Sequence, residues 1–292
     1  IVTTLATEAN IVADVATARS AFTNYCDILK NRDSSETWSF RFSHDTSNEY
    51  AVSEVTNTGT ATYQALRAMS GSDAWLGISV KIDSAIGTAA GSQAHTNGAD
   101  TTVTHSLGTT RHAVLLFPRA NGDIYWWHPD LTGGNLLIWN NHAAEAASTR
   151  IKNIGTNSFD IESAAPTDTY DYLVLSDNDQ IDLGTYLGNG STDGPYVDTG
   201  HRAQMVAIKD TGTQGDFGMW TSGANPYNPA LEIMWFEEPD EEKTGNAIDI
   251  LSRGFKLRNA GNDDNGSGLK YTYISFAEAL SIDRAGRLLT AR

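Results

Sequence analysis

The sequence has little cysteine, and this shortage excludes several kinds of site. Its 292 residues include a single cysteine, Cys26. One cysteine can form neither an intrachain disulfide nor a zinc site made of several thiolates. Cys26 lies between Tyr25 and Asp27, where we expect the start of a β-strand and a buried, unreactive thiol.

Basic residues and long apolar runs are also scarce. Lys and Arg number 20 against 36 Asp and Glu, which gives a formal net charge of −16. A surface this acidic repels nucleic-acid phosphates and anionic lipids, so neither is an expected partner. The longest apolar runs, such as residues 113–117, are as long as a strand, whereas a membrane-spanning helix needs about 20 residues. We therefore expect no membrane insertion.

Thr, Ser, Gly, Asn and Asp are abundant between short runs of aromatic and β-branched residues. This pattern is typical of an all-β protein built of sandwiches or barrels. The segment Ala9–Phe22 is the exception, because its apolar residues at positions 11, 12, 15 and 18 have helical spacing. We therefore predict a short N-terminal helix before an all-β body.

Three segments share one arrangement: an apolar strand ending in a basic residue, a polar turn, and a strand carrying tryptophan. This repetition predicts three tandem β-units, at residues 1–95, 96–182 and 183–292. The composition of Gly87–Asp100 predicts a linker, and a second joint is expected near Asp177–Gly184. The three segments are Cys26–Phe42, Ala113–Pro129 and Gln204–Trp220.

The stretch Tyr186–Gly212 is rich in glycine and could be mistaken for a phosphate-binding loop. It has no lysine in the position such a loop requires and no helix pattern after it. We instead predict a strand at 185–187, a tight turn at 188–190 and an edge strand at 195–197, where Pro195 suits an edge. The glycines are thus interpreted as architectural.

No assembled catalytic motif is recognisable. The sequence lacks G-x-S-x-G and H-E-x-x-H, and its seven histidines are scattered without ligand spacing. Glu238, Asp240 and Glu242 alternate as the carboxylates of laminarinase-like glucanases do, and paired carboxylates can cleave glycosidic bonds. However, Pro239 and Glu241 separate these acids, and proline disfavours an interior strand. We expect an exposed acidic loop and no enzyme.

Two oxygen-rich loops are weak candidates for structural calcium, which prefers carboxylate and carbonyl ligands. An EF-hand beginning at Asp263 would need an acid where Ile274 stands. Turn chemistry alone also explains such clusters of Asn, Asp and Gly. We therefore expect no cofactor, and the calcium candidates are Asp177, Asp179, Asp182, Asp263 and Asp264.

Aromatic residues are the remaining signal for binding. Trp38, Trp220 and Trp235 are expected in the core. Trp126 and Trp127 are adjacent, so in a strand they point to opposite faces, and one of them is a candidate for the surface or an interface. Exposed tryptophan and tyrosine rings can stack on sugar faces, which makes a glycan-binding module a second hypothesis.

Three phrases in the last third of the chain resemble a repeat found in tail-fibre and other virion proteins of tailed phages, notably marine ones. They are YLGNGSTDGPYVDTGHRAQMVAIKDTG, ANPYNPALEIMW and AIDILSRGFKLRNAGNDDNGSGLKYTYISFAE, within Thr185–Glu278. The middle unit looks like a diverged copy, and the first unit is fainter. His201 stands where that family has an aromatic residue, so we add His201 and Tyr227 to the candidate contact residues.

The resemblance implies jelly-roll or lectin-like β-sandwich units and a place on the exterior of a virion. The implied role is a tail-fibre or baseplate protein that contacts other virion proteins and a host glycan or receptor, as a homo-oligomer such as a trimer. A capsid decoration or head fibre is the alternative, and a glycan-binding module or glycan-degrading enzyme is the rival of another class. No catalytic residue is carried over from the resemblance.

Overall fold

The computed structural model describes residues 2–7, 25–31, 37–42, 51–56, 61–64, 74–81, 84–120, 123–139, 142–212, 215–235 and 243–278, with side chains from residue 84 onward. Within them the regular structure is β, apart from one short 3-10 turn, η2 (Ser84–Ile86), which confirms the predicted all-β fold. The predicted helix at Ala9–Phe22, the acidic run Glu238–Glu242 and the tail after Glu278 lie outside the described residues.

The N-terminal part contributes six strands in two antiparallel three-stranded sheets, ordered β1-β6-β2 and β3-β4-β5. Cys26 lies at the start of a strand, as predicted, and pairs with Val80. The strands are β1 (Val2–Thr7), β2 (Tyr25–Asn31), β3 (Thr37–Phe42), β4 (Ala51–Thr56), β5 (Ala61–Gln64) and β6 (Ala74–Lys81).

The middle part forms a six-stranded antiparallel sheet, ordered β12-β11-β10-β9-β15-β7, which we call the middle sheet. A three-stranded sheet, β13-β14-β8, accompanies it. The strands are β7 (Thr88–His95), β8 (Thr101–Thr104), β9 (His112–Pro118), β10 (Tyr125–Trp127), β11 (Asn135–Ile138), β12 (Ala146–Ala147), β13 (Ile151–Lys152), β14 (Ser158–Ile161) and β15 (Asp168–Ser176).

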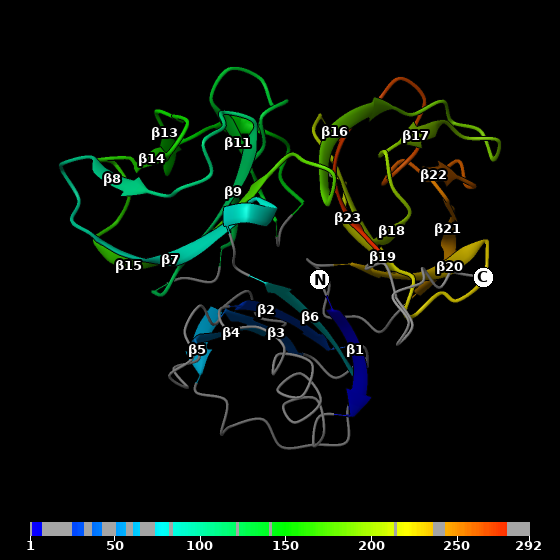
Figure 1. Cartoon of the computed structure of the whole chain (residues 1–292), viewed down its shortest axis with the longest axis horizontal. Coiled ribbons are helices and arrows are strands. Elements are labelled where there is room, and N and C mark those ends of the chain that lie inside the picture. The colour runs from blue at the N-terminus through cyan, green and yellow to red at the C-terminus, as the bar shows by residue number, and fades with distance from the viewer. Residues whose placement is uncertain are drawn as a thin grey trace.

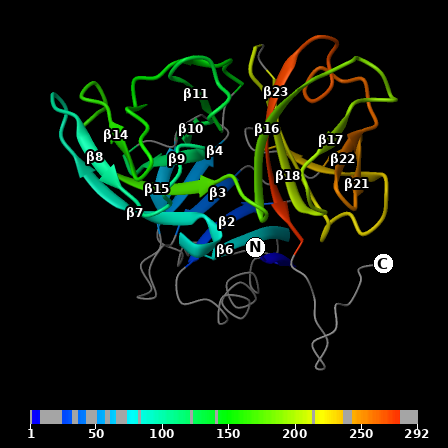
Figure 2. The ribbon, with the colours of Figure 1, turned by 45° about the horizontal axis from the view of Figure 1, so that its top comes forward.

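The last part forms an eight-stranded sheet, ordered β16-β23-β18-β19-β20-β21-β22-β17, which we call the C-terminal sheet. It curls round its own apolar core, as Figure 2 shows. The strands are β16 (Ile181–Leu187), β17 (Tyr196–Asp198), β18 (Ala203–Asp210), β19 (Phe217–Thr221), β20 (Ala230–Trp235), β21 (Lys243–Leu251), β22 (Gly254–Leu257) and β23 (Lys270–Ala277).

One strand order recurs along the chain. In the middle sheet the first and last strands, β7 and β15, pair, and β9, β10 and β11 follow β15. In the C-terminal sheet β16 and β23 pair in the same way, and β18, β19 and β20 follow. The N-terminal sheet repeats the beginning of this order as β1-β6-β2. Figure 1 shows the middle strands (green) and C-terminal strands (yellow to orange) side by side, with the N-terminal strands (blue) along one side of both.

The central strands are apolar on both faces, and the packing explains why. Every residue of β9 is buried. Ala113, Leu115 and Phe117 face a core shared with the C-terminal sheet, which we call the junction core. Val114 and Leu116 face the inner core of the middle part. A strand covered on both faces loses the usual alternation of apolar and polar residues. The apolar run at 113–117 is therefore the signature of a sheet that is covered on both sides.

The last strand, β23, contributes alternate residues to two different cores. Tyr271 and Tyr273 lie in the inner core of the C-terminal sheet, whereas Ile274 and Phe276 lie in the junction core. The ring of Tyr186 stacks on that of Tyr271, with centroids 5.1 Å apart and planes 18° apart. Aromatic rings packed in this way stabilise a core beyond their buried area.

The linker predicted at Gly87–Asp100 is wrong. Residues 88–95 form β7, which pairs with β15 from His95 and Asp168 to Thr88 and Leu175. Small residues suit this strand because the phenol of Tyr172 lies over it: a Cβ at Gly91 would come within 2.5 Å of the Tyr172 oxygen. The second predicted joint coincides with the turn between β15 and β16. The exact unit boundaries stay a prediction.

Candidate functional site

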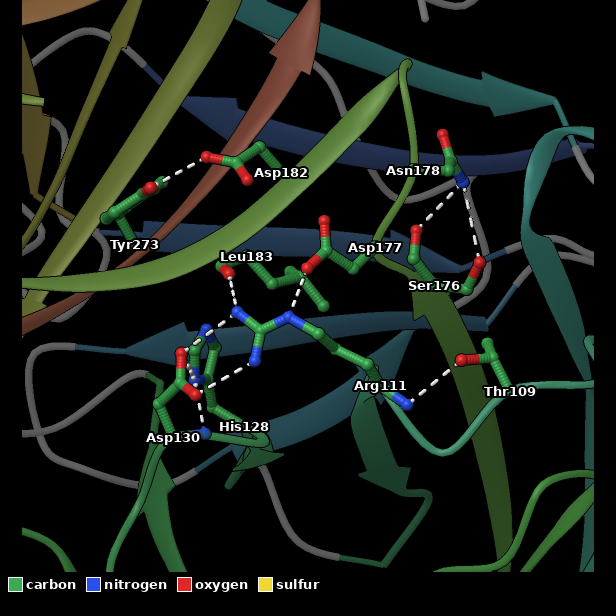
Figure 3. Close-up of polar contacts among 10 residues, drawn as sticks. All are labelled: Thr109, Arg111, His128, Asp130, Ser176, Asp177, Asn178, Asp182, Leu183 and Tyr273. Carbon is green, nitrogen blue, oxygen red and sulfur yellow. Dashed lines mark hydrogen bonds and ion pairs between the residues drawn. The ribbon is translucent and has the colours of Figure 1, made fainter. Parts of the chain in front are cut away.

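A group of charged residues lies where the middle and C-terminal sheets meet. Figure 3 shows the guanidinium of Arg111, just before β9, between two carboxylates and a carbonyl. Its Nη1 and Nη2 donate to the two carboxylate oxygens of Asp130, at 2.9 and 3.2 Å. Its Nε contacts Asp177, and Nη2 also donates to the carbonyl of Leu183 in β16. One side chain thus connects three segments across the junction.

The pairing shifts the titration of both partners. The hydrogen bonds to Asp130 raise the pKa of Arg111 even though partial burial acts against the charge. Burial also opposes the charge of Asp130, yet the bonds from Arg111 hold the pKa of Asp130 below its ordinary value. Both groups are therefore charged at neutral pH. A bidentate arginine–carboxylate pair has a defined orientation as well as opposite charges, so it restrains the Asp130 loop relative to Arg111.

Further contacts tie the same two sheets together. Lys270 Nζ donates to the carbonyl of Asp130 at 2.7 Å, and the Glu145 amide donates to the carbonyl of Thr211 at 2.9 Å. His142 Nε2 lies 3.1 Å from an Asp216 oxygen. Backbone and side-chain bonds thus surround the apolar junction core.

Burial shifts the pKa of two groups at the junction, the imidazole of His128 and the carboxyl of Asp182. His128 is fully buried, and burial lowers its pKa to about 4. The backbone N–H of Asp130 donates to its Nδ1 at 3.2 Å, as suits a neutral imidazole. Asp182 accepts a 2.6 Å hydrogen bond from the Tyr273 hydroxyl, and burial raises the pKa of the Asp182 carboxyl. The junction is therefore sensitive to proton concentration.

The calcium candidates do not converge. Asp177 pairs with Arg111, Asp182 with Tyr273, and Asp179 is exposed. In the other loop Asp264 is buried, and Asn259 Nδ2 donates to one of its oxygens at 2.8 Å. Among the described residues, no three His, Cys, Asp or Glu side chains are grouped so that they could hold a metal ion. Calcium binding by Asp177, Asp179, Asp182, Asp263 or Asp264 therefore gains no support from their placement.

The glycine-rich stretch after β16 instead packs against the loop that contains Asp263 and Asp264. A Cβ at Gly188 would lie 2.2 Å from the carbonyl oxygen of Gly266, so only glycine allows the two backbones to approach this closely. Asn265 is fully buried between them: it accepts from the Asn189 amide at 2.9 Å and donates to the carbonyls of Ser191 and Asn259 at 2.8 and 2.6 Å. Asn, Asp and Gly here close a turn, as their chemistry predicts.

Burial perturbs the acid in this loop. Burial raises the pKa of the Asp264 carboxyl to about 7, because a carboxylate removed from water loses its hydration. The hydrogen bond from Asn259 opposes the shift only in part. Asp264 therefore titrates near neutral pH.

The expected contact residues are placed very differently from one another. Trp126 is fully buried in the junction core, where its ring stacks on Phe217 with centroids 5.2 Å apart. Trp127 points to the opposite face, as predicted for neighbours in a strand, and is half-buried near His112. His201 is half-buried, and its Nε2 lies 2.9 Å from the Ser275 hydroxyl. Trp126 thus contacts the other sheet of its own chain.

Among the residues whose side chains the structure describes, Tyr227 is the most exposed large apolar one, at 78%. It lies in the loop between β19 and β20, which two asparagines hold in place. Asn225 donates to the carbonyl of Glu232 and accepts from its N–H, both at 2.8 Å. Asn228 makes the same pair of bonds with Ile250, at 2.8 and 2.9 Å. Each amide imitates the pairing of a neighbouring strand, so the loop presents Tyr227 from a fixed base.

Sequence reasoning missed Arg111, Asp130 and the two asparagines. A weak signal existed for three of them: Arg111 stands one residue before His112 and the apolar run 113–117, and Asn225 and Asn228 each precede a proline. A proline after asparagine favours a turn, but the partner carbonyls lie on strands far along the chain. Spacing alone could not reveal them.

Among the described residues, no helix is long and apolar enough to cross a membrane. No curated protein and no solved structure matches the chain. A family described as a domain of unknown function (DUF7483) matches residues 90–279, from β7 to the end of β23. This match covers the middle and C-terminal sheets with the junction between them, and the chain therefore belongs to that family.

Proposed function

We propose that the chain is a structural and adhesive component of a tailed-phage particle, mounted on the tail or baseplate. Two features support the proposal. The phrases within Thr185–Glu278 resemble a repeat of virion proteins, and one strand order recurs along the chain in packed sheets. On this proposal the units are lectin-like β-sandwiches, the chain is no enzyme, and its partners are other virion proteins in a homo-oligomer such as a trimer.

The single observation that carries the adhesive role is the Tyr227 loop. An exposed aromatic ring on a rigid base loses little conformational entropy when it binds, and tyrosine is enriched among residues that dominate interfaces. The four amide bonds of Asn225 and Asn228 provide that base. A protein that only filled space in a particle would have no use for such a clamped aromatic ring.

Particle localisation tests the structural role. Antibodies against the purified chain should label intact virions at the tail end in electron microscopy, and the chain should co-purify with particles through a density gradient. Labelling of the capsid would favour the alternative of a decoration or head fibre. Absence of the chain from purified particles would refute the virion role altogether.

Loss of the Tyr227 ring tests the adhesive role. Tyr227→Ala should weaken binding of the assembled protein to host cells at least about tenfold, the loss of one interface hot spot. Leu187→Ala is the matched control, because Leu187 is also exposed, at 63%, but lies at the end of β16. Equal binding by both variants and the unaltered chain would exclude Tyr227 as a contact.

The glycan-binding module is the second candidate, favoured by the same exposed ring. Under it, a glycan array should give hits that Tyr227→Ala abolishes and Leu187→Ala keeps. The glycan-degrading alternative requires Glu238, Asp240 or Glu242 to line a cleft, so polysaccharide turnover lost in E238A, D240A or E242A would establish it over both other roles.

A further inference from the structure

Two buried histidines of the middle part lie against each other near the start of β9. His105 follows β8 and is 8% exposed, while His112 begins β9 and is fully buried. Their ring centroids are 4.8 Å apart, and the ring planes are nearly perpendicular, at 79°. Neither the junction nor the Tyr227 loop involves this pair.

The pair leaves polar atoms without hydrogen bonds. Both ring nitrogens of His105 and Nε2 of His112 are buried and have no hydrogen-bond partner. A buried polar atom left without a partner destabilises the fold, because its hydration is lost and not replaced. The other nitrogen of His112, Nδ1, lies 2.8 Å from the carbonyl of Thr109 and must donate to it, since a carbonyl only accepts. In the neutral ring this leaves Nε2 of His112 with a free lone pair.

The segment that carries both rings is fixed in place by the neighbouring loop. The His105 amide donates to the carbonyl of Asn157 at 2.7 Å, and the Gly108 amide donates to the side-chain oxygen of Asn157 at 2.8 Å. The Thr109 amide donates to the carbonyl of Thr156 at 3.1 Å. These contacts hold the segment from His105 to Thr109 in place, and the bond from His112 Nδ1 to the Thr109 carbonyl ties the second ring to it, as a preorganised site requires.

We propose that His105 and His112 are two ligands of a divalent transition-metal ion of the kind that imidazole prefers, with Zn²⁺ as its probe. His112 binds through Nε2, and the carbonyl of Thr109 holds its other nitrogen, an arrangement typical of metal-binding histidines. Two imidazoles on one tetrahedral ion, with bonds of about 2.0–2.1 Å, have centroids about 5 Å apart. The observed spacing of 4.8 Å fits.

The rival explanation is that the rings pack edge to face and hold no ion. Ring packing alone leaves the three ring nitrogens without partners, whereas a bound metal ion accepts one lone pair from each histidine. The described residues supply no third His, Cys, Asp or Glu to the pair. Water therefore completes the coordination, and the ion binds more weakly than in a closed four-ligand site. The consequence for the protein is a clamp that locks the segment between β8 and β9.

Calorimetry on the full chain tests the proposal. Chelator-treated protein titrated with ZnCl₂ should bind one ion, and Mg²⁺ should not compete, because magnesium prefers oxygen ligands. H105Q and H112Q should each lose the site. H95Q is the matched control: His95 is also buried, but its nitrogens lie 2.8 Å from the Thr101 hydroxyl and 3.2 Å from the carbonyl of Ala165. H142Q controls for zinc bound by an exposed histidine.

Two further measurements keep the test decisive if a variant folds poorly. In the unaltered protein, zinc should shift the ¹⁵N resonance of His112 Nε2 and leave those of His95 in place. Zinc at about 100 times its dissociation constant should raise the melting temperature by about 5–10 °C. No binding by the unaltered chain, or binding retained in both H105Q and H112Q, would overturn the proposal.

Discussion

The middle and C-terminal sheets share one strand order, but the buried contacts at particular strand ends differ between them. In the middle sheet Arg119 makes a bidentate contact with the buried carboxylate of Asp171, at 2.8 and 3.0 Å. In the C-terminal sheet the amides of Asn225, Asn228 and Asn265 bond to backbone groups. The same strand order is thus compatible with different side-chain contacts at the strand ends.

Removing an aromatic ring from the junction should have the largest effect, because both sheets contribute to that core. Trp126→Ala should lower the free energy of unfolding by about 3–5 kcal/mol. Trp127→Ala, one residue away on the half-buried face, should cost clearly less. Urea denaturation measures both. Equal losses would mean that the junction core contributes no more than the inner face.

A glycine substitution tests the close approach of two loops in the C-terminal part. Gly188→Ala should cost about 3 kcal/mol, the upper end for overpacking, because its Cβ meets backbone at Gly266. Gly212→Ala is the control, since the nearest atom to its Cβ is an Asp210 oxygen at 3.9 Å. Urea denaturation again provides the comparison, and a Gly188→Ala chain as stable as Gly212→Ala would contradict the close approach.

Arg111 tests whether charge holds the two sheets together. Arg111→Ala leaves Asp130 and Asp177 without their cation, but the guanidinium is 44% exposed, so the expected loss is only about 1–2 kcal/mol. Arg253→Ala breaks the more exposed pair with Asp198 and should change stability by less than about 0.5 kcal/mol. Thermal unfolding at low and high salt checks both. Salt should remove a larger fraction of the Arg253 contribution, because that pair is more exposed.

Stability should also depend on pH, with opposite signs in the two sheets. Burial raises the pKa of Asp264 to about 7, so between about pH 4 and 7 the folded chain binds more protons than the unfolded chain. Its contribution is complete below pH 4 and is lost as pH rises through 7. Burial lowers the pKa of His128 to about 4, so its contribution is present above about pH 6.5 and is lost as pH falls through 4.

Neutral replacements separate these two slopes, each at most about 1.4 kcal/mol per pH unit. Asp264→Asn should be more stable relative to the unaltered chain at pH 8 than at pH 4. His128→Asn keeps an acceptor for the Asp130 amide and should lose stability more slowly from pH 6.5 to 4. Urea titrations across this range measure both, and parallel curves for all three chains would refute the assigned pKa shifts.

Sequence patterns predicted the features that depend on neighbouring residues. The all-β fold, the strand at Cys26 and the turn after β16 follow from local sequence patterns and turn chemistry. β7 was mistaken for a linker because Thr88–His95 is made of small residues, whose fit depends on Tyr172 across the sheet. Arg111, Asp130 and Leu183 meet only after three distant segments have folded together.

The junction core has a consequence for how this architecture can be cut or recombined. Each large sheet buries one apolar face against the other, so either sheet alone would expose an apolar face to water. A fragment that begins at β16 would display Met205, Ala207 and Ile274 to water and would self-associate through them. We therefore expect the two sheets to fold as a pair and a separated sheet to associate through its exposed apolar face.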